Sequence, residues 1–105
     1  MVQYIVAFNE DNYQSEVSVY DVEDSLGDIF TVENNPNIDD YFRESFREKA
    51  DDEPMNVGQL VLVTEQDLTN LVDKYPADKT IADMAAAVLN AMDIYPDAVF
   101  YYTYE

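Results

Sequence analysis

Carboxylates recur at a regular spacing in the middle of the chain. Asp40, Glu44 and Glu48 are four residues apart, and Asp51 and Asp52 follow at the end of the same stretch. On an α-helix, which rises about 1.5 Å per residue, the first three would form a row with about 6 Å between neighbours. Like charges at this spacing mildly destabilise a helix, so helix stability does not explain the row.

Two interpretations of this carboxylate row are open. Arg43 and Arg47 lie beside it and could pair with Asp39, Glu44 or Asp51, which would make the row structural. Alternatively, regularly spaced negative charge on a rigid element is similar to a nucleic-acid backbone, since duplex DNA carries one charge per about 1.7 Å of axis. The second interpretation requires much of the remaining negative charge to gather on the same face.

Negative charge dominates the whole chain, which has 23 acidic residues, five basic residues and a net charge of −18. Residues 1–42 contain ten acids and no base, whereas all five bases fall in residues 43–79. Any one of these acids could belong to a solvated turn, but ordinary turns also contain lysine. Solubility alone requires a net charge of only about 2 to 8 in magnitude. The excess disfavours direct binding of nucleic acid and favours a partner with a basic surface.

We predict that acids near the N-terminus contact this partner together with the carboxylate row. They are Glu10, Asp11, Glu16, Asp21, Glu23, Asp24 and Asp28.

Tyrosine, with nine residues, is the other abundant side chain with binding chemistry. Tyrosine is enriched at the centres of interfaces, and its ring can stack on arginine. We expect Tyr13 and Tyr20 to be exposed and to anchor the partner. The aromatic run 101–104 fits better with a strand that packs against helices.

The composition disfavours catalysis and metal binding. The chain has no cysteine and no histidine, which removes thiolate chemistry and the commonest metal ligand. Paired carboxylates can hydrolyse glycosides, but that reaction needs a cleft that is hard to build in so small a domain. The acids at 51–53 could bind Ca²⁺ weakly, yet no EF-hand loop surrounds them, and the two glycines form no phosphate loop. We therefore expect no enzyme, no catalytic residue, no metal site and no cofactor.

Length and hydropathy predict a single compact domain over residues 1–105. Hydrophobic residues make up 48% of the chain, which suffices for a core despite the charge. The longest apolar stretch, residues 84–89, is much shorter than the roughly 20 residues of a membrane span, and the first residues lack the basic start of a signal peptide. We expect a cytoplasmic protein that does not contact a membrane.

The elements that must position the acids follow from periodicity. Alternating apolar residues predict strands at 2–8, 15–22 and 28–33. The first is apolar on both faces and is expected inside a sheet, while the turn signal after it predicts a hairpin with the second. Residues 25–27 are expected to form a break.

Helical spacing begins at Ile38 and is expected to end near Asp52, so this helix would carry the carboxylate row. A strand at 58–64, helices at about 65–75 and 80–93, and an aromatic strand at 98–104 complete the chain. Strands and helices do not alternate strictly. We therefore predict an α+β fold with a mostly antiparallel sheet of four to five strands and about three helices packed on one side.

These patterns favour a non-enzymatic acidic protein that mimics DNA and blocks the basic groove of a DNA- or RNA-binding protein. In charge and size the chain resembles the DNA-mimic inhibitors that phages and other mobile elements use against restriction enzymes, CRISPR effectors, repair glycosylases or nucleoid proteins. The resemblance implies an anti-restriction, anti-CRISPR or similar role in host takeover, exercised in the host cytoplasm if the protein is phage-encoded. The sequence also leaves open whether the protein forms a homodimer.

Two alternatives to mimicry remain. The charge could be an adaptation to high salt or a means of solubility in a housekeeping protein. The chain could also be an adaptor or antitoxin that binds a specific protein by adding its aromatic strand to the partner's sheet.

Overall fold

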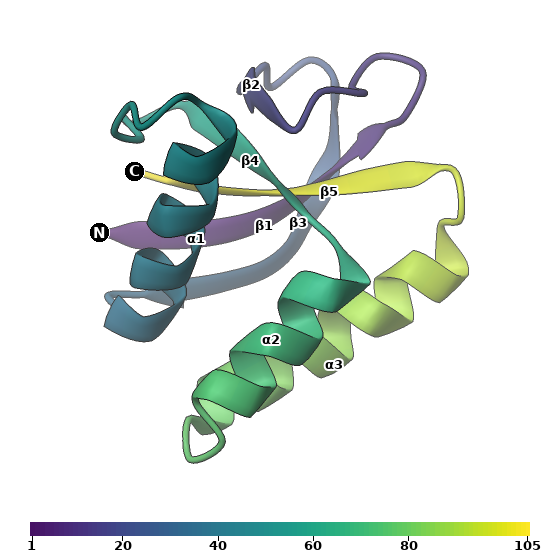
Figure 1. The fold of residues 1–105 in the computed structure, drawn as a ribbon. Helices are drawn as coiled ribbons and strands as arrows, with labels where there is room; N and C mark the ends of the chain where they lie inside the picture. Colours follow the sequence, from purple (N-terminus) through teal and green to yellow (C-terminus); the bar gives the residue numbers. More distant parts are fainter.

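Five strands form one antiparallel sheet, and three helices cover one of its faces (Figure 1). The computed structural model describes all residues from 1 to 105. The strand order is β2-β4-β5-β1-β3, so β5 is central and β2 and β3 are the edges. The strands are β1 (Val2–Asn9), β2 (Val17–Val19), β3 (Ser25–Glu33), β4 (Gln59–Val63) and β5 (Ala98–Tyr104).

Each helix begins after a polar residue whose side chain accepts a hydrogen bond from a backbone amide of the first turn. These N-caps are Asn35, Thr64 and Asp78, and Thr64 also forms a capping box with Asp67. Such a cap stabilises a helix by about 1 kcal/mol because it satisfies a free backbone donor. The helices are α1 (Pro36–Lys49), α2 (Glu65–Lys74) and α3 (Lys79–Ile94). None of them is long and apolar enough to cross a membrane.

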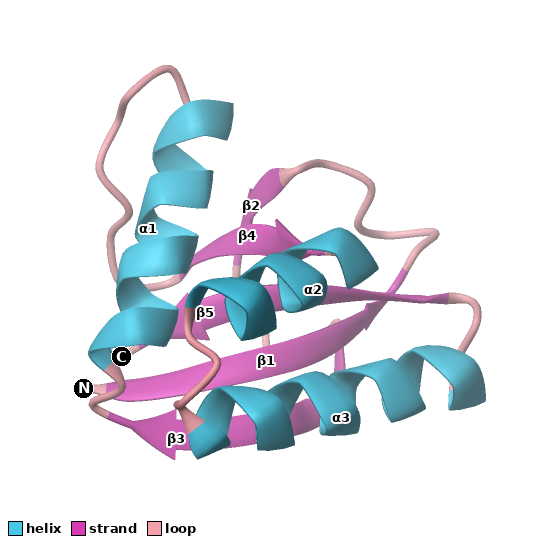
Figure 2. Cartoon of the chain, turned by 60° about the horizontal axis from the view of Figure 1, so that its bottom comes forward, coloured by secondary structure: helices cyan, strands magenta, loops and turns pink.

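Strand alternation separates the apolar side chains into two clusters. Ile5 and Tyr102 face the helices, where they join residues of α1, α2 and α3 in a core of 18 buried side chains. Val6 and Tyr101 face the other way and belong to a smaller cluster of five. We call this second side of the sheet, which no helix covers, the open face (Figure 2).

The predicted α+β class, with its antiparallel sheet and its helices on one side, is confirmed. The helices α2 and α3 and the strands β4 and β5 begin and end within one residue of the predicted bounds. The strand β1, expected inside the sheet, lies between β5 and β3.

The predicted hairpin between residues 2–8 and 15–22 is wrong. The strand β1 pairs with β3 and β5, and β2 is reduced to three residues that pair with β4. The cause is the apolar surface that each strand offers, because Phe30 and Val32 of β3 pack against the core beside β1, whereas β2 contributes only Val17. Residues 25–27, expected to be a break, open β3, where Gly27 takes a φ of 137° next to an irregularity in the β1–β3 register.

The aromatic strand β5 lies in the centre of the sheet and has no free edge. Its two edges pair with β1 and β4. A strand that is apolar on both faces buries more of its apolar surface in the centre of a sheet than at an edge. Binding by strand addition through β5, as in one of the alternatives above, is therefore excluded by the topology.

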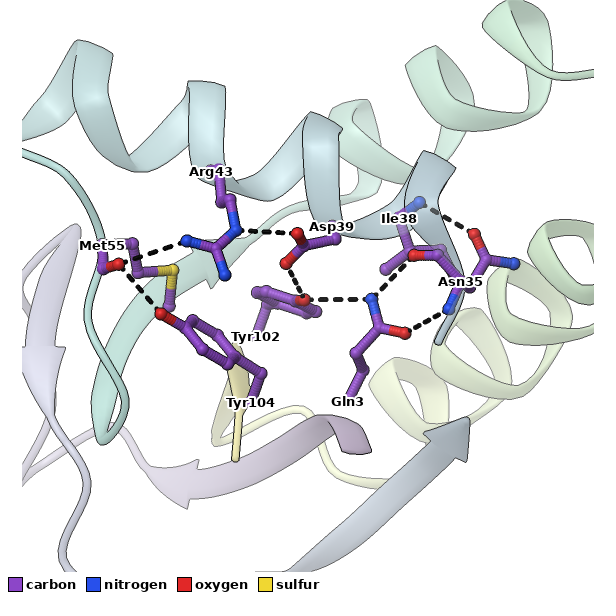
Figure 3. Close-up of polar contacts among 8 residues, drawn as sticks. All are labelled: Gln3, Asn35, Ile38, Asp39, Arg43, Met55, Tyr102 and Tyr104. Atoms are coloured by element: carbon purple, nitrogen blue, oxygen red, sulfur yellow. Dashed lines mark hydrogen bonds and ion pairs between the residues drawn. The ribbon is translucent and has the colours of Figure 1, made fainter. Parts of the chain in front are cut away.

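Hydrogen bonds join the start of α1 to β1 and β5 (Figure 3). The side chain of Gln3, which is buried, donates to the Asn35 carbonyl at 2.9 Å and to the Tyr102 hydroxyl at 3.1 Å, and it accepts from the Asn35 amide at 2.7 Å. The Tyr102 hydroxyl in turn donates to Asp39 at 2.9 Å. A buried glutamine is stable at this position because its donor and acceptor atoms are all satisfied.

The same network continues through α1 to the loop before β4. Asp39 forms a 2.7 Å ion pair with Arg43, whose guanidinium lies 4.4 Å from the ring centre of Tyr104. Arg43 and the Tyr104 hydroxyl both donate to the Met55 carbonyl, at 3.3 and 2.9 Å (Figure 3). Arg43 therefore holds helix, sheet and loop together.

The network predicts a specific loss of stability in the variant Tyr102→Phe. The change removes the donor to Asp39 and the acceptor for Gln3 while keeping the ring, so we expect the free energy of unfolding to fall by about 1 to 2 kcal/mol. Urea titration measures this loss. The matched control is Tyr95→Phe, since Tyr95 is 52% exposed, and the control should change stability by less than about 0.5 kcal/mol. Equal effects of the two variants would contradict the role given to the network.

Candidate protein-binding face

The open face is partly covered by the segment that joins β1 to β3. Tyr13 packs on Phe8 with ring centres 4.2 Å apart, and it meets Tyr101 edge to face at 5.9 Å. Tyr20 contacts Phe8 edge to face at 5.9 Å from the other end of the segment. The segment thus runs over the side of the sheet that has no helices.

Tyr13 does not have the exposure that we predicted for it. Only 7% of its surface is accessible, because it fills the space over Phe8 and Tyr101 that a helix fills on the other side. Burial also raises the pKa of its phenol. Tyr13 is a core residue, whereas Tyr20 is half-buried and keeps part of its ring accessible.

Seven predicted acids lie on this segment and on the start of β3, and we call them the acidic rim. All are exposed except Asp24, which is half-buried, and none forms an ion pair. Asp21 and Asp24 line a shallow hollow together with Tyr13 and Tyr20. The members of the acidic rim are Glu10, Asp11, Glu16, Asp21, Glu23, Asp24 and Asp28.

The carboxylate row of Asp40, Glu44 and Glu48 lies elsewhere. All three are exposed on α1, which packs on the helix side of the sheet, away from the segment that carries the acidic rim (Figure 1). The predicted acids therefore form two groups.

Basic side chains partly neutralise the row but not the rim. Asp40 and Glu44 share a hollow with Arg43 and Arg47, and Glu44 lies 3.9 Å from Arg47 in a largely exposed ion pair. Asp39 is paired with Arg43. The structural interpretation of the row thus holds for part of it, which leaves the acidic rim as the better candidate for binding.

The helix α1 also ends at Lys49, earlier than the predicted end near Asp52. Asp51 and Asp52 take φ values of 53° and 64°, in the left-handed region that reverses the chain after a helix. These two acids therefore belong to the turn after α1 and do not extend the row.

Beside the acidic rim, the open face has a pocket that sequence reasoning missed. Its volume is about 230 Å³, and Tyr4 and Tyr20 line it together with Asp28, Val57, Thr103 and Glu105. The Tyr4 hydroxyl donates to the Glu105 carboxylate, which raises the pKa of Tyr4 to about 12, and Asp28 adds to the shift. The alternation of β1 places Tyr4 on the same face as Val6 and Phe8, so that part of the pocket had a signal in the sequence.

The chemistry of this pocket is limited by its size and by its donors. Small-molecule sites usually enclose about 300 to 1,000 Å³, so this pocket suits a single side chain better than a substrate. No group of three or more acidic side chains converges anywhere in the structure in a way that could hold a metal ion.

Comparison with known proteins adds no assignment. No protein family model, no curated protein and no solved structure matches the chain.

Like Tyr4, Tyr41 and Tyr102 have phenols with raised pKa values, and this predicts a loss of stability at alkaline pH. Burial and the hydrogen bond to Asp67 raise the pKa of Tyr41 to about 12, against 10.0 for a free phenol, and burial also raises that of Tyr102. A raised pKa means that the neutral phenol is favoured in the folded state. The resulting stability is fully present below pH 10 and is lost as the pH rises from about 10 to 12.

We therefore expect the urea midpoint to fall steadily above pH 10, with a smaller fall in the variant Tyr41→Phe than in Tyr95→Phe. Urea titrations at several pH values from 8 to 11.5 test this. A midpoint that stayed constant over that range would contradict the assignment.

Proposed function

We propose that this chain is a non-enzymatic inhibitor that mimics DNA and occupies the basic groove of a nucleic-acid-binding protein. The observation that supports it is the acidic rim, in which seven carboxylates lie within residues 10–28 without a basic residue or an ion pair. Uncompensated charge costs stability, so a segment that keeps this much of it has a role other than holding the fold together.

The surroundings of the acidic rim also suit a protein partner. Val19 and Val22 are 67% and 70% exposed and line the same hollow as Asp21 and Asp24. Apolar side chains surrounded by polar ones are the usual arrangement of a protein interface. In the proposed complex the carboxylates take the places of phosphates, while Val19, Val22 and Tyr20 exclude water from the space between the two proteins.

Competition would follow from electrostatics. A strongly negative chain is steered towards the same basic groove that attracts DNA, so it binds fast and at the expense of nucleic acid. An anti-restriction, anti-CRISPR or similar role against host proteins uses this mechanism and requires no catalytic residue.

Capture and release test the proposal directly. The chain is immobilised, a bacterial lysate is passed over it at about 0.1 M salt, and bound proteins are eluted with a salt gradient. Each purified partner is then tested for release of labelled DNA on addition of the chain. We expect DNA-binding proteins to elute together and to release their DNA when an equimolar amount of the chain is added. Their affinity for the chain should be at least about tenfold lower at 0.5 M salt than at 0.1 M salt.

Matched variants separate the acidic rim from the rest of the charge. Asp21→Lys with Glu23→Lys should abolish most of the competition, whereas Asp83→Lys with Asp93→Lys on α3 makes the same change in charge and should leave most of it. The variant Glu44→Lys with Glu48→Lys measures how much the carboxylate row contributes to the competition. An affinity independent of salt, or equal losses in the rim and α3 variants, would refute mimicry through the rim.

The salt-adapted alternative makes a different prediction about folding. The molecule exposes 5920 Å² for 18 net charges, and their mutual repulsion at 0.15 M salt is about 2 to 3 kcal/mol. A domain usually has about 5 to 15 kcal/mol of stability, so the chain should fold without molar salt.

We expect the chain to be folded at 0.15 M NaCl and to gain about 2 kcal/mol between 0.15 and 0.5 M as the repulsion is screened. Urea titration at each salt concentration gives the gain, which should be smaller in the variant Asp21→Asn with Glu23→Gln. A chain that is unfolded at 0.15 M and folds only in molar salt would favour adaptation instead.

A further inference from the structure

We propose that the pocket of Tyr4, Tyr20, Asp28, Val57, Thr103 and Glu105 receives one arginine side chain of the partner protein. The inference rests on the proposed function in that it takes the partner to be a basic protein. It adds a defined contact point to a mechanism otherwise based on diffuse charge.

The dimensions of the pocket fit one long side chain. Its volume of about 230 Å³ equals roughly eight water molecules at about 30 Å³ each, which is too little for a folded segment or a large ligand. Three strands and the residues before β4 form its walls, since Tyr4 lies on β1, Asp28 on β3 and Thr103 on β5. Strand residues therefore form part of the wall, whereas Tyr20, Val57 and Glu105 lie outside the strands.

The lining suits a flat cation with an aliphatic stem. A guanidinium can stack on a tyrosine ring and donate to carboxylates at the same time, and Tyr4 and Tyr20 provide the rings. Asp28 and Glu105 provide the carboxylates, and Val57, which is 65% exposed, offers apolar surface to the stem. The hydrogen bond from Tyr4 to Glu105 holds one carboxylate in place before binding.

Charge complementarity favours an organic cation over other occupants. No basic side chain lines the pocket, so Asp28 and Glu105 have no counter-charge within the chain. Two carboxylates are too few for Ca²⁺, which takes about six to eight oxygen ligands. The acidic rim, to which Asp28 belongs, attracts the same positive surface from which the arginine would project.

The test uses the whole chain, labelled with ¹⁵N, and needs no partner protein. N-acetyl-arginine amide is titrated to tens of millimolar at 0.1 M salt, and N-acetyl-citrulline amide serves as its neutral counterpart of the same shape. We expect saturable shifts of the amide signals of residues 4, 20, 28, 58 and 103, with half-saturation in the millimolar range, and no saturation with the citrulline compound.

Two variants with the same loss of charge decide whether the pocket is responsible. Asp28→Asn should raise the half-saturation concentration about three- to fivefold, whereas Asp83→Asn on the exposed side of α3 should leave it unchanged. The unperturbed spectrum of the remaining residues shows whether each variant is folded.

Equal effects of Asp28→Asn and Asp83→Asn, saturation by the citrulline compound, or shifts spread evenly over all acidic residues would overturn the proposal. Because no partner is present, these outcomes are separate from those of the capture experiment. A chain that displaces DNA but does not bind arginine would retain the proposed function and lose only this pocket.

Discussion

The scarcity of positive charge is the constraint on which this structure depends. Five basic residues cannot pair with 23 acidic ones, and only two ion pairs form, both within α1. Where carboxylates approach the core, neutral donors supplement or replace lysine and arginine. Tyr102 donates to Asp39 and Tyr41 to Asp67, while the amides of Asn35 and Asn37 donate to Asp78, whose pKa falls as a result. The abundant tyrosines thus serve first as internal hydrogen-bond donors.

The small number of basic residues determines where negative charge remains uncompensated. Arg43 is committed to Asp39, to the Met55 carbonyl and to the ring of Tyr104, and Arg47 lies near Glu44. Three of the five bases lie on α1 and the other two, Lys74 and Lys79, lie on α2 and α3, so the acidic rim on the other side of the sheet receives none. The open face consequently combines negative charge, exposed valines and a tyrosine pocket, which is the combination on which both proposals rest.

Local sequence patterns predicted the positions of most helices and strands. The predictions that were wrong depended on pairing between residues far apart in the sequence. The helical spacing of α2 and α3 and the apolar runs of β4 and β5 place these elements within one residue, because each pattern depends only on near neighbours. The hairpin prediction was wrong because β1 could pair with either β2 or β3. The choice depends on which strand buries more apolar surface against helices that come later in the chain. The predicted exposure of Tyr13 was wrong for a related reason, since no sequence pattern indicates that this side chain folds back over Phe8 on the helix-free face.

The sequence by itself determined the excess of acids, the absence of histidine and cysteine, the positions of most helices and strands, and the α+β class, because these follow from composition and short-range periodicity. Only the tertiary structure decided that the acids form two groups, that arginines partly neutralise one of them, and that Tyr4, Asp28 and Glu105 meet in one pocket. Periodicity assigns a side chain to one face of its own element. Which elements then lie beside that face depends on strand pairing between distant residues, and this is set by the burial of the whole core.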